Sequence, residues 1–159
     1  MLSISLASAQ TNFEEGGLKY SYGGNVENNV SVVGYSFYEP FVSINNHAVV
    51  YYNGTSYIVT CIAINAFRCY SFSYISIPDS VTIIGNSTFD GCPFLTQVVF
   101  SDSSKLGTIG DGAFSNSGLS SINMSASVAS IGEGAFARTR LTSVTIGAAV
   151  TSIGSLCVC

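Results

Sequence analysis

The chain is 159 residues long, 47% hydrophobic and only 9% charged, with a formal net charge of −4. The length suits one domain, but the charged fraction is far below the roughly 25% of an average soluble domain. The five lysine and arginine residues are too few for a basic surface that would bind nucleic acid or anionic lipid. No apolar run approaches the roughly 18 residues that span a bilayer, so we expect no direct membrane insertion by this chain.

The first ten residues, Met1 to Gln10, contain the small-residue pattern Ala7-Ser8-Ala9 that signal peptidase accepts. They lack a positive charge, and their apolar stretch is short. Two interpretations stay open: the remnant of a secretory signal, or a disordered terminus. Four N-x-S/T sequons suit a secreted chain, although several would arise by chance in so Ser/Thr-rich a sequence. The candidate N-glycosylation sites are Asn29, Asn53, Asn86 and Asn123.

Residues 11–58 are predicted to form a β-rich N-terminal cap. Leu18–Tyr22 and Val30–Val33 alternate in hydrophobicity around a Gly-Gly-Asn turn, which is typical of a β-hairpin. Asn53-Gly54 separates two further apolar runs, and Asn-Gly supplies the positive φ values of a type I′ hairpin turn. Such a segment would cover the first unit of a repeat array, whose interior and strand edge are otherwise exposed.

From residue 59 onward one phrase recurs, V/L-x-x-I-G-x-x-A/T-F, each time followed by L-x-x-V/I and a further apolar residue. Its isoleucine falls at 84, 109, 131 and 153, and a degenerate first copy has Ile62 followed by Ala63. Intervals of 22 and 25 residues indicate a solenoid. The predicted units lie near 59–80, 81–105, 106–127, 128–149 and, as a partial copy, 150–159.

Each unit is expected to contribute a short strand that pairs in parallel with the next unit. The G-x-x-A-F segment is predicted to form a single helical or 3₁₀ turn that places its phenylalanine in the core. The glycine is expected to be left-handed or crowded. The four isoleucines should then lie above one another in one column, and a single unit should not fold alone.

The composite V-x-x-I-G-x-x-A-F-x-x-C-x-x-L-x-x-V-x-I, present in Val81–Phe100 with Cys92 in its slot, resembles the BspA-like leucine-rich repeat. The resemblance extends from about Val59 to Gly154. It departs from the pattern in that cysteine is kept only at Cys69 and Cys92, and the loop at Ser101–Lys105 is expected to add three residues. The resemblance implies a right-handed, horseshoe-type β/α solenoid that is rich in β-structure.

The resemblance also implies a secreted or surface-displayed recognition protein. Bacteria and parasitic protists use such proteins to bind host matrix proteins, host cells or other microbes. The alternative is a structural or truncated repeat fragment that self-associates through its open C-terminal edge.

The sequence shows no catalytic constellation, so we expect no enzyme activity, cofactor or metal. The single histidine, His47, has no cysteine or carboxylate partner near it in sequence. Asp90, Asp111 and Glu133 supply one carboxylate per unit, whereas calcium needs six to eight oxygen ligands, so we expect these residues to cap turns. Five cysteines without a C-x-x-C pair do not form a zinc motif.

Cys69 and Cys92 are predicted to occupy matching positions in adjacent units. A disulfide between them is geometrically feasible, and a pair of buried free thiols is the alternative.

The outward face of the predicted repeat strands is the remaining candidate site. It would be neutral and flat, able to accept a protein or a glycan by hydrogen bonding around one aromatic anchor, or it would merely face solvent. Its residues are Tyr74, Ser76, Gln97, Val99, Ser121, Asn123, Ser143 and Thr145.

Overall fold

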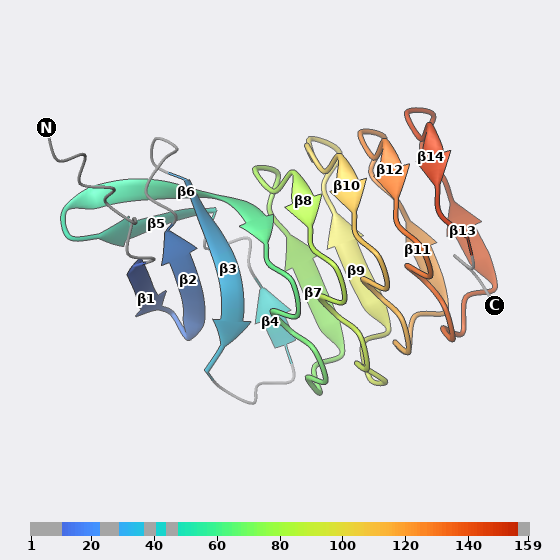
Figure 1. Ribbon diagram of the computed structural model, residues 1–159, viewed down its shortest axis with the longest axis horizontal. Helices are drawn as coiled ribbons and strands as arrows, with labels where there is room; N and C mark the ends of the chain where they lie inside the picture. The colour runs from blue at the N-terminus through green and yellow to red at the C-terminus, as the bar shows by residue number, and fades with distance from the viewer. Residues whose placement is uncertain (1–10, 23–28, 37–40, 44–47, 156–159) are drawn as a thin grey trace, which may run out of the picture.

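The computed structural model describes residues 11–22, 29–36, 41–43 and 48–155. The candidate signal segment 1–10, His47 and the C-terminal Cys157 and Cys159 lie outside them. The described residues form fourteen β-strands and no helix, hence no helix long and apolar enough to cross a membrane. Figure 1 shows an elongated stack of rungs with the first and last described strands at opposite ends of the molecule.

Two rows of short parallel strands run along the solenoid (Figure 1). The first row carries the repeated isoleucines and comprises β6 (Thr55–Ile62), β8 (Ile83–Ile84), β10 (Thr108–Ile109), β12 (Ser130–Ile131) and β14 (Ser152–Ile153). The second row comprises β4 (Phe41–Ser43), β7 (Tyr74–Ile77), β9 (Gln97–Phe100), β11 (Ser121–Asn123) and β13 (Ser143–Thr145). The chain passes from one row to the other within every rung.

The N-terminal strands extend the first row. β1 (Thr11–Glu15), β2 (Leu18–Tyr22) and β3 (Asn29–Tyr35) form an antiparallel meander, and β3 then pairs in parallel with β6. β5 (Val49–Tyr52) pairs antiparallel with β6 around Asn53-Gly54. The φ angles of 49° and 77° at these two residues are those a type I′ turn requires. The Asn53-Gly54 hairpin is present as predicted. β2 and β3 pair antiparallel, but the Gly-Gly-Asn turn predicted between them lies outside the described residues, and β1 is an addition that the sequence patterns did not indicate.

The predicted isoleucine column is confirmed. Ile62, Ile84, Ile109, Ile131 and Ile153 are successive register partners in the first row. A second column consists of stacked phenylalanine rings, with centroids 5.0–5.5 Å apart and interplanar angles of 3–13°. Its members are Phe67, Phe89, Phe114 and Phe136. The rungs therefore share one continuous core, with the aromatic rings in offset stacks.

The predicted helical or 3₁₀ turns are not confirmed, since no described residue is assigned to a helix. In the outer turn of the second unit, the Phe89 N–H donates to the Ala113 carbonyl of the next rung (2.7 Å), whereas the Asp90 N–H donates to Ser87 within its own turn (3.2 Å). Every second amide thus bonds along the stack, where it cannot make the i→i−4 bonds of a helix. A succession of tight turns results.

Each outer turn contains two left-handed positions, with φ between 52° and 68° at the residues concerned. The first is held by Asn65, Ser87, Gly112 and Gly134, and the second by Cys69, Gly91, Asn116 and Arg138. The glycine after each isoleucine is crowded instead of left-handed. A Cβ atom on Gly110, for example, would lie 2.7 Å from the Asn86 nitrogen of the preceding rung.

Candidate ligand-binding face

The second row of strands presents most of the predicted face. Gln97, Ser121, Asn123, Ser143 and Thr145 are exposed, and Tyr74 and Val99 are half-buried. The pairings Tyr74↔Gln97 and Asn123↔Thr145 place these side chains in columns across neighbouring rungs. The face is neutral, since amides and hydroxyls make up its exposed positions.

Ser76 does not belong to this face, because its residue is only 4% exposed. β7 is an interior strand: β4 pairs with it on the side away from β9, and Ser43 is the register partner of Ser76. The strand neighbour comes from a segment more than thirty residues away in sequence, so the repeat pattern gave no sign of it.

The second row is interrupted between β9 and β11. β4, β7 and β9 form one ladder and β11 and β13 another, but β9 and β11 are not paired. The first row is paired at the same level, where Thr108 and Ile109 are in register with Ile83 and Ile84. We call the gap between residues 96–100 and 121–123 the seam.

Insertions at both ends of β9 account for the seam. Relative to its neighbours, the 25-residue unit has two extra residues between Val98 and Leu106 and one between Phe89 and Leu95. The expectation that all three lie in Ser101–Lys105 is therefore wrong. Extra backbone before and after β9 displaces this strand from the register that the 22-residue units keep with one another.

The rungs are tied together again beyond each end of the seam. The Gly118 N–H donates to the Cys92 carbonyl (3.2 Å). At the other end the Ser127 hydroxyl lies 2.8 Å from the Leu106 carbonyl oxygen and 2.9 Å from that of Ser104. At this second end the Ser127 hydroxyl takes the place of a backbone donor. The opening is therefore confined to β9 and β11.

Two hollows lie along the seam. One, of about 280 Å³, is lined by Thr96–Phe100 and Ser121–Asn123. The other, of about 200 Å³, is lined by residues 100–102 and 123–126. Both include Phe100 and Asn123 in their linings, so they lie next to each other along the seam. Sequence reasoning selected Gln97, Val99, Ser121 and Asn123, but it did not predict that a hollow separates the first two from the last two.

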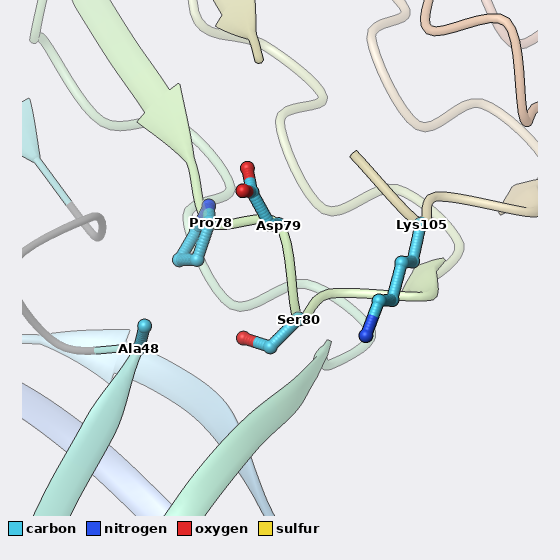
Figure 2. A pocket seen from close by; sticks show the side chains of 5 residues that line it. All are labelled: Ala48, Pro78, Asp79, Ser80 and Lys105. Carbon is cyan, nitrogen blue, oxygen red and sulfur yellow. The ribbon is translucent and has the colours of Figure 1, made fainter. Parts of the chain in front are cut away.

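A third hollow, of about 430 Å³, lies beside the start of β5 and is lined by Ala48, Pro78, Asp79, Ser80 and Lys105. Figure 2 shows the Lys105 side chain extending toward Ser80 from a separate loop. Ser80 donates to the Val59 carbonyl (2.7 Å) and Asp79 accepts a hydrogen bond from Ser101. These hydrogen bonds connect the 78–80 loop to β6 and to Ser101. The hollow was not predicted, because its residues come from three separate segments of the chain.

The three described cysteines are free thiols, so Cys69 and Cys92 are not joined. They are not in matching positions either: Cys69 shares the left-handed position with Gly91, and a Cβ on Gly91 would lie 3.1 Å from the Cys69 sulfur. Cys92 is buried, and its thiol donates to the Phe67 carbonyl (3.1 Å). Burial raises the pKa of Cys92 to about 11, which leaves the thiol protonated at neutral pH.

Two of the three turn carboxylates, those of Asp90 and Asp111, link rungs to one another, and no described helix exists for them to cap. The Asn86 Oδ1 accepts the Asp111 N–H (3.0 Å), and the Asp111 Oδ1 accepts the Glu133 N–H (2.8 Å). Asp90 accepts from Arg68 (3.1 Å) and Asn116 (2.9 Å) of the adjacent rungs. Among the described residues no three potential metal ligands come together.

The four sequons differ in their surroundings. Asn53 is exposed in the β5–β6 turn, Asn123 is exposed on the candidate face and Asn29 is half-buried at the start of β3. The Asn86 side chain is already engaged, since its Nδ2 donates to Asp111 (3.4 Å) while its Oδ1 accepts from the same residue.

Three solved structures are similar to this chain. One is the pneumococcal vaccine antigen PcpA (24% identity, TM-score 0.75), where 89% of this chain matches 39% of the other. A leucine-rich repeat protein from Bacteroides capillosus matches with 25% identity and TM-score 0.72, over 84% of this chain and 96% of the other. A leucine-rich cell surface protein from Faecalibacterium prausnitzii matches with 24% identity and TM-score 0.67, over 91% of this chain and 45% of the other.

This chain therefore spans less than half the length of the first and third of these proteins. No curated protein matches it. The family model of the BspA type leucine-rich repeat region matches residues 59–159 in six copies. With the isoleucine and phenylalanine columns running through the same residues, this match shows that the chain belongs to the BspA-type leucine-rich repeat family.

Proposed function

We propose that this protein is a secreted or cell-surface recognition module that binds host proteins, host cells or microbial surfaces through the second row of strands. The observation that carries the proposal is the neutral, exposed polar face formed by Gln97, Ser121, Asn123, Ser143 and Thr145. Flat polar surfaces of this kind suit hydrogen-bonded recognition of a macromolecule. Two proteins of similar fold, a vaccine antigen and a cell surface protein, support the extracellular location.

The proposed module is not catalytic. Its face offers amides and hydroxyls, and a hydroxyl acts as a nucleophile only beside a general base. No histidine or carboxylate lies on the face among the described residues.

The N-terminal strands are proposed to act as a cap over residues 59–159. Val59 and Ile62 of β6 are fully buried. β3 pairs with this strand on the side away from β8, and β5 pairs with its first residues, Thr55–Ile58. An end unit of this kind covers the first rung of a solenoid.

A second candidate function, self-association, is favoured by the exposure of the last rung. Ile153 is 53% exposed and Ile146 49%, whereas Ile131 in the preceding rung is 3% exposed. β14 and β13 also present unpaired strand edges among the described residues, and such edges favour pairing with another chain.

The recognition proposal is tested by binding of the purified 159-residue chain to immobilised host matrix proteins, cultured host cells and microbial cells. A Gln97→Ala/Ser143→Ala variant should lose at least about tenfold in affinity, or about 1.4 kcal/mol. The control is Glu133→Gln, an exposed change on the outer turn. Equal binding by both variants would count against the face. So would a failure of the wild type and both variants to bind any of these targets.

Size-exclusion chromatography at several concentrations tests the second candidate. A mass that rises with concentration supports edge pairing, and a strict monomer contradicts it.

A further inference from the structure

We propose that the seam between β9 and β11 is a subsite for a neutral oligosaccharide. The inference rests on the proposed function, because the seam lies within the same face. It adds to that function a ligand class and a defined position, and it depends on the break in the second row of strands that the repeat pattern did not predict.

Unpaired backbone groups line the seam. The Met124 N–H donates to the Thr145 carbonyl and the Thr142 N–H donates to Ser120, so the even-numbered residues of β11 face β13. In a parallel ladder alternate residues face opposite neighbours, which directs the amides of Ser121 and Asn123 toward β9. There they meet no backbone acceptor, since β9 and β11 are unpaired.

A peptide strand cannot fill this gap. Neighbouring strands lie about 4.8 Å apart, so insertion of one between β9 and β11 would require about twice that separation. The same two rungs are held at ladder spacing on their other sides, by the β8–β10 pairing and by the Phe89 N–H to Ala113 bond (2.7 Å). An occupant must therefore approach from outside and reach the backbone groups with small polar substituents.

The side chains at the seam match the chemistry of sugar hydroxyls. Each hydroxyl both donates and accepts, as does the carboxamide of glutamine or asparagine. Gln97 and Asn123 are exposed on opposite walls of the larger hollow. Neither side-chain carboxamide has a hydrogen-bond partner among the described residues. Ser121 adds an exposed hydroxyl on the same strand as Asn123.

The apolar part of the seam suits the C–H faces of a pyranose ring. Val99 and Phe100 are half-buried in the walls. Tyr74, also half-buried, is the register partner of Gln97 on β7, one strand away from the seam in the same row. Aromatic side chains of this type combine an apolar surface with a polar group.

Charge and size limit the ligand further. Asp102 is the one ionisable residue that lines either hollow, so an acidic sugar would meet a carboxylate and no cation. The two adjoining hollows have volumes of about 280 and 200 Å³, each just below the range of about 300–1,000 Å³ for small-ligand sites, so each has room for only a small group such as one sugar ring. A short neutral oligosaccharide fits both limits.

The test is a titration of ¹⁵N-labelled, unglycosylated chain with lactose, cellobiose and N,N′-diacetylchitobiose, with 3′-sialyllactose as the acidic comparator. Amide shifts should change at residues 97–100 and 121–123 and stay constant in β13, with dissociation constants of about 1 mM. A Gln97→Ala/Asn123→Ala variant should bind at least about tenfold more weakly, whereas Glu133→Gln, an exposed change on the outer turn, should bind like the wild type.

The proposal is overturned if no neutral sugar shifts these amides up to about 20 mM, if the double variant binds as well as the wild type, or if sialyllactose binds more tightly. A second variant, in which Phe94, Asp102 and Ser103 are deleted, restores a 22-residue unit while keeping Gln97 and Asn123. It should lose sugar binding; if it does not fold, the double variant decides.

The two proposals fail separately. If matrix or cell binding persists and no sugar binds, the subsite is wrong and the recognition function stands. If neither is observed, both fail.

Discussion

The glycine that follows each isoleucine is required by the close approach of the neighbouring rung. A Cβ on Gly85, Gly110, Gly132 or Gly154 would fall within 2.7 Å of a backbone atom of the preceding rung. Gly107, in the same unit as Gly110, has its nearest neighbour at 3.7 Å, the Thr82 carbonyl oxygen. Two glycines three residues apart thus serve different purposes.

Replacement of Gly110 by alanine should destabilise the chain by about 1–3 kcal/mol, because the added methyl group can be accommodated only if the rungs move apart. Gly107→Ala is the matched control, with ordinary van der Waals contact at its methyl group. It should leave stability unchanged or raise it by up to about 1 kcal/mol by restricting the unfolded chain. Urea denaturation measures both, and equal losses would contradict the crowding argument.

Asp90 connects three rungs through its bonds to Arg68 and Asn116. Partial burial by itself raises the pKa of Asp90, but the hydrogen bonds from Asn116 and Arg68 and the charge of Arg68 outweigh it and hold the pKa below its usual value of 3.8. A carboxyl with a depressed native pKa stabilises the fold above its unfolded pKa. That contribution is lost as the pH falls below about 3.8.

Asp90→Asn should therefore flatten the dependence of stability on pH below about pH 4 and lower stability near neutral pH. The effect should stay below about 1 kcal/mol, because Arg68 is largely exposed and solvent screens the pair. Thermal unfolding between about pH 2.5 and 7 is the measurement. Asp102→Asn, which removes an exposed carboxylate outside this network, is the control, and an identical pH profile for both variants would refute the assignment.

At the scale of elements, the seam separates two ladders that are otherwise built alike. The Gln97 N–H on β9 donates to the Ser73 carbonyl at 3.2 Å, whereas Ser121, its equivalent on β11, faces an unpaired strand. A hydrogen-bonded amide exchanges with solvent only when the structure opens. The break therefore has a direct consequence for exchange rates.

The amides of Ser121 and Asn123 should exchange at least about tenfold faster than that of Gln97 in native-state hydrogen exchange. The comparison is internal, since all three belong to exposed residues of the second row. Deletion of Phe94, Asp102 and Ser103 should slow the exchange of Ser121 and Asn123 and leave that of Gln97 unchanged. Slow exchange of all three in the wild type would show that β9 and β11 pair in solution.

Sequence periodicity was enough to predict the solenoid, the isoleucine column and the Asn-Gly hairpin, because these follow from local spacing. It was not enough for the seam, since a 25-residue interval reports an insertion but not the hydrogen bonds that the insertion breaks. The error over Cys69 had a visible signal. Cys69 and Cys92 are 23 residues apart, whereas Ile62 and Ile84, and Phe67 and Phe89, are 22 apart. The burial of Ser76 had none, because β4 is distant in sequence.

For the whole molecule, stability comes from each rung covering the one before it. Ile62, Ile84 and Ile109 are fully buried and Ile131 is 3% exposed, but Ile153, in the last described rung, is 53% exposed. The core thus continues undiminished as far as Ile131, and the isoleucine of the last described rung is exposed. Nothing in the described residues after β14 plays the part that the N-terminal strands play next to β6.

Ile153→Lys should reduce concentration-dependent association of the 159-residue chain, because an ammonium group would have to be buried for a second copy to extend the isoleucine column. The expected result in light scattering coupled to size exclusion is a monomer at concentrations where the wild type shows a larger mass. Ile83→Lys is the matched control: Ile83 is 45% exposed on β8, in the interior of the stack, and its substitution leaves the open end intact. If the two variants associate equally, the contact is not at the C-terminal rung, and if the wild type is monomeric throughout, the exposed column does not drive pairing.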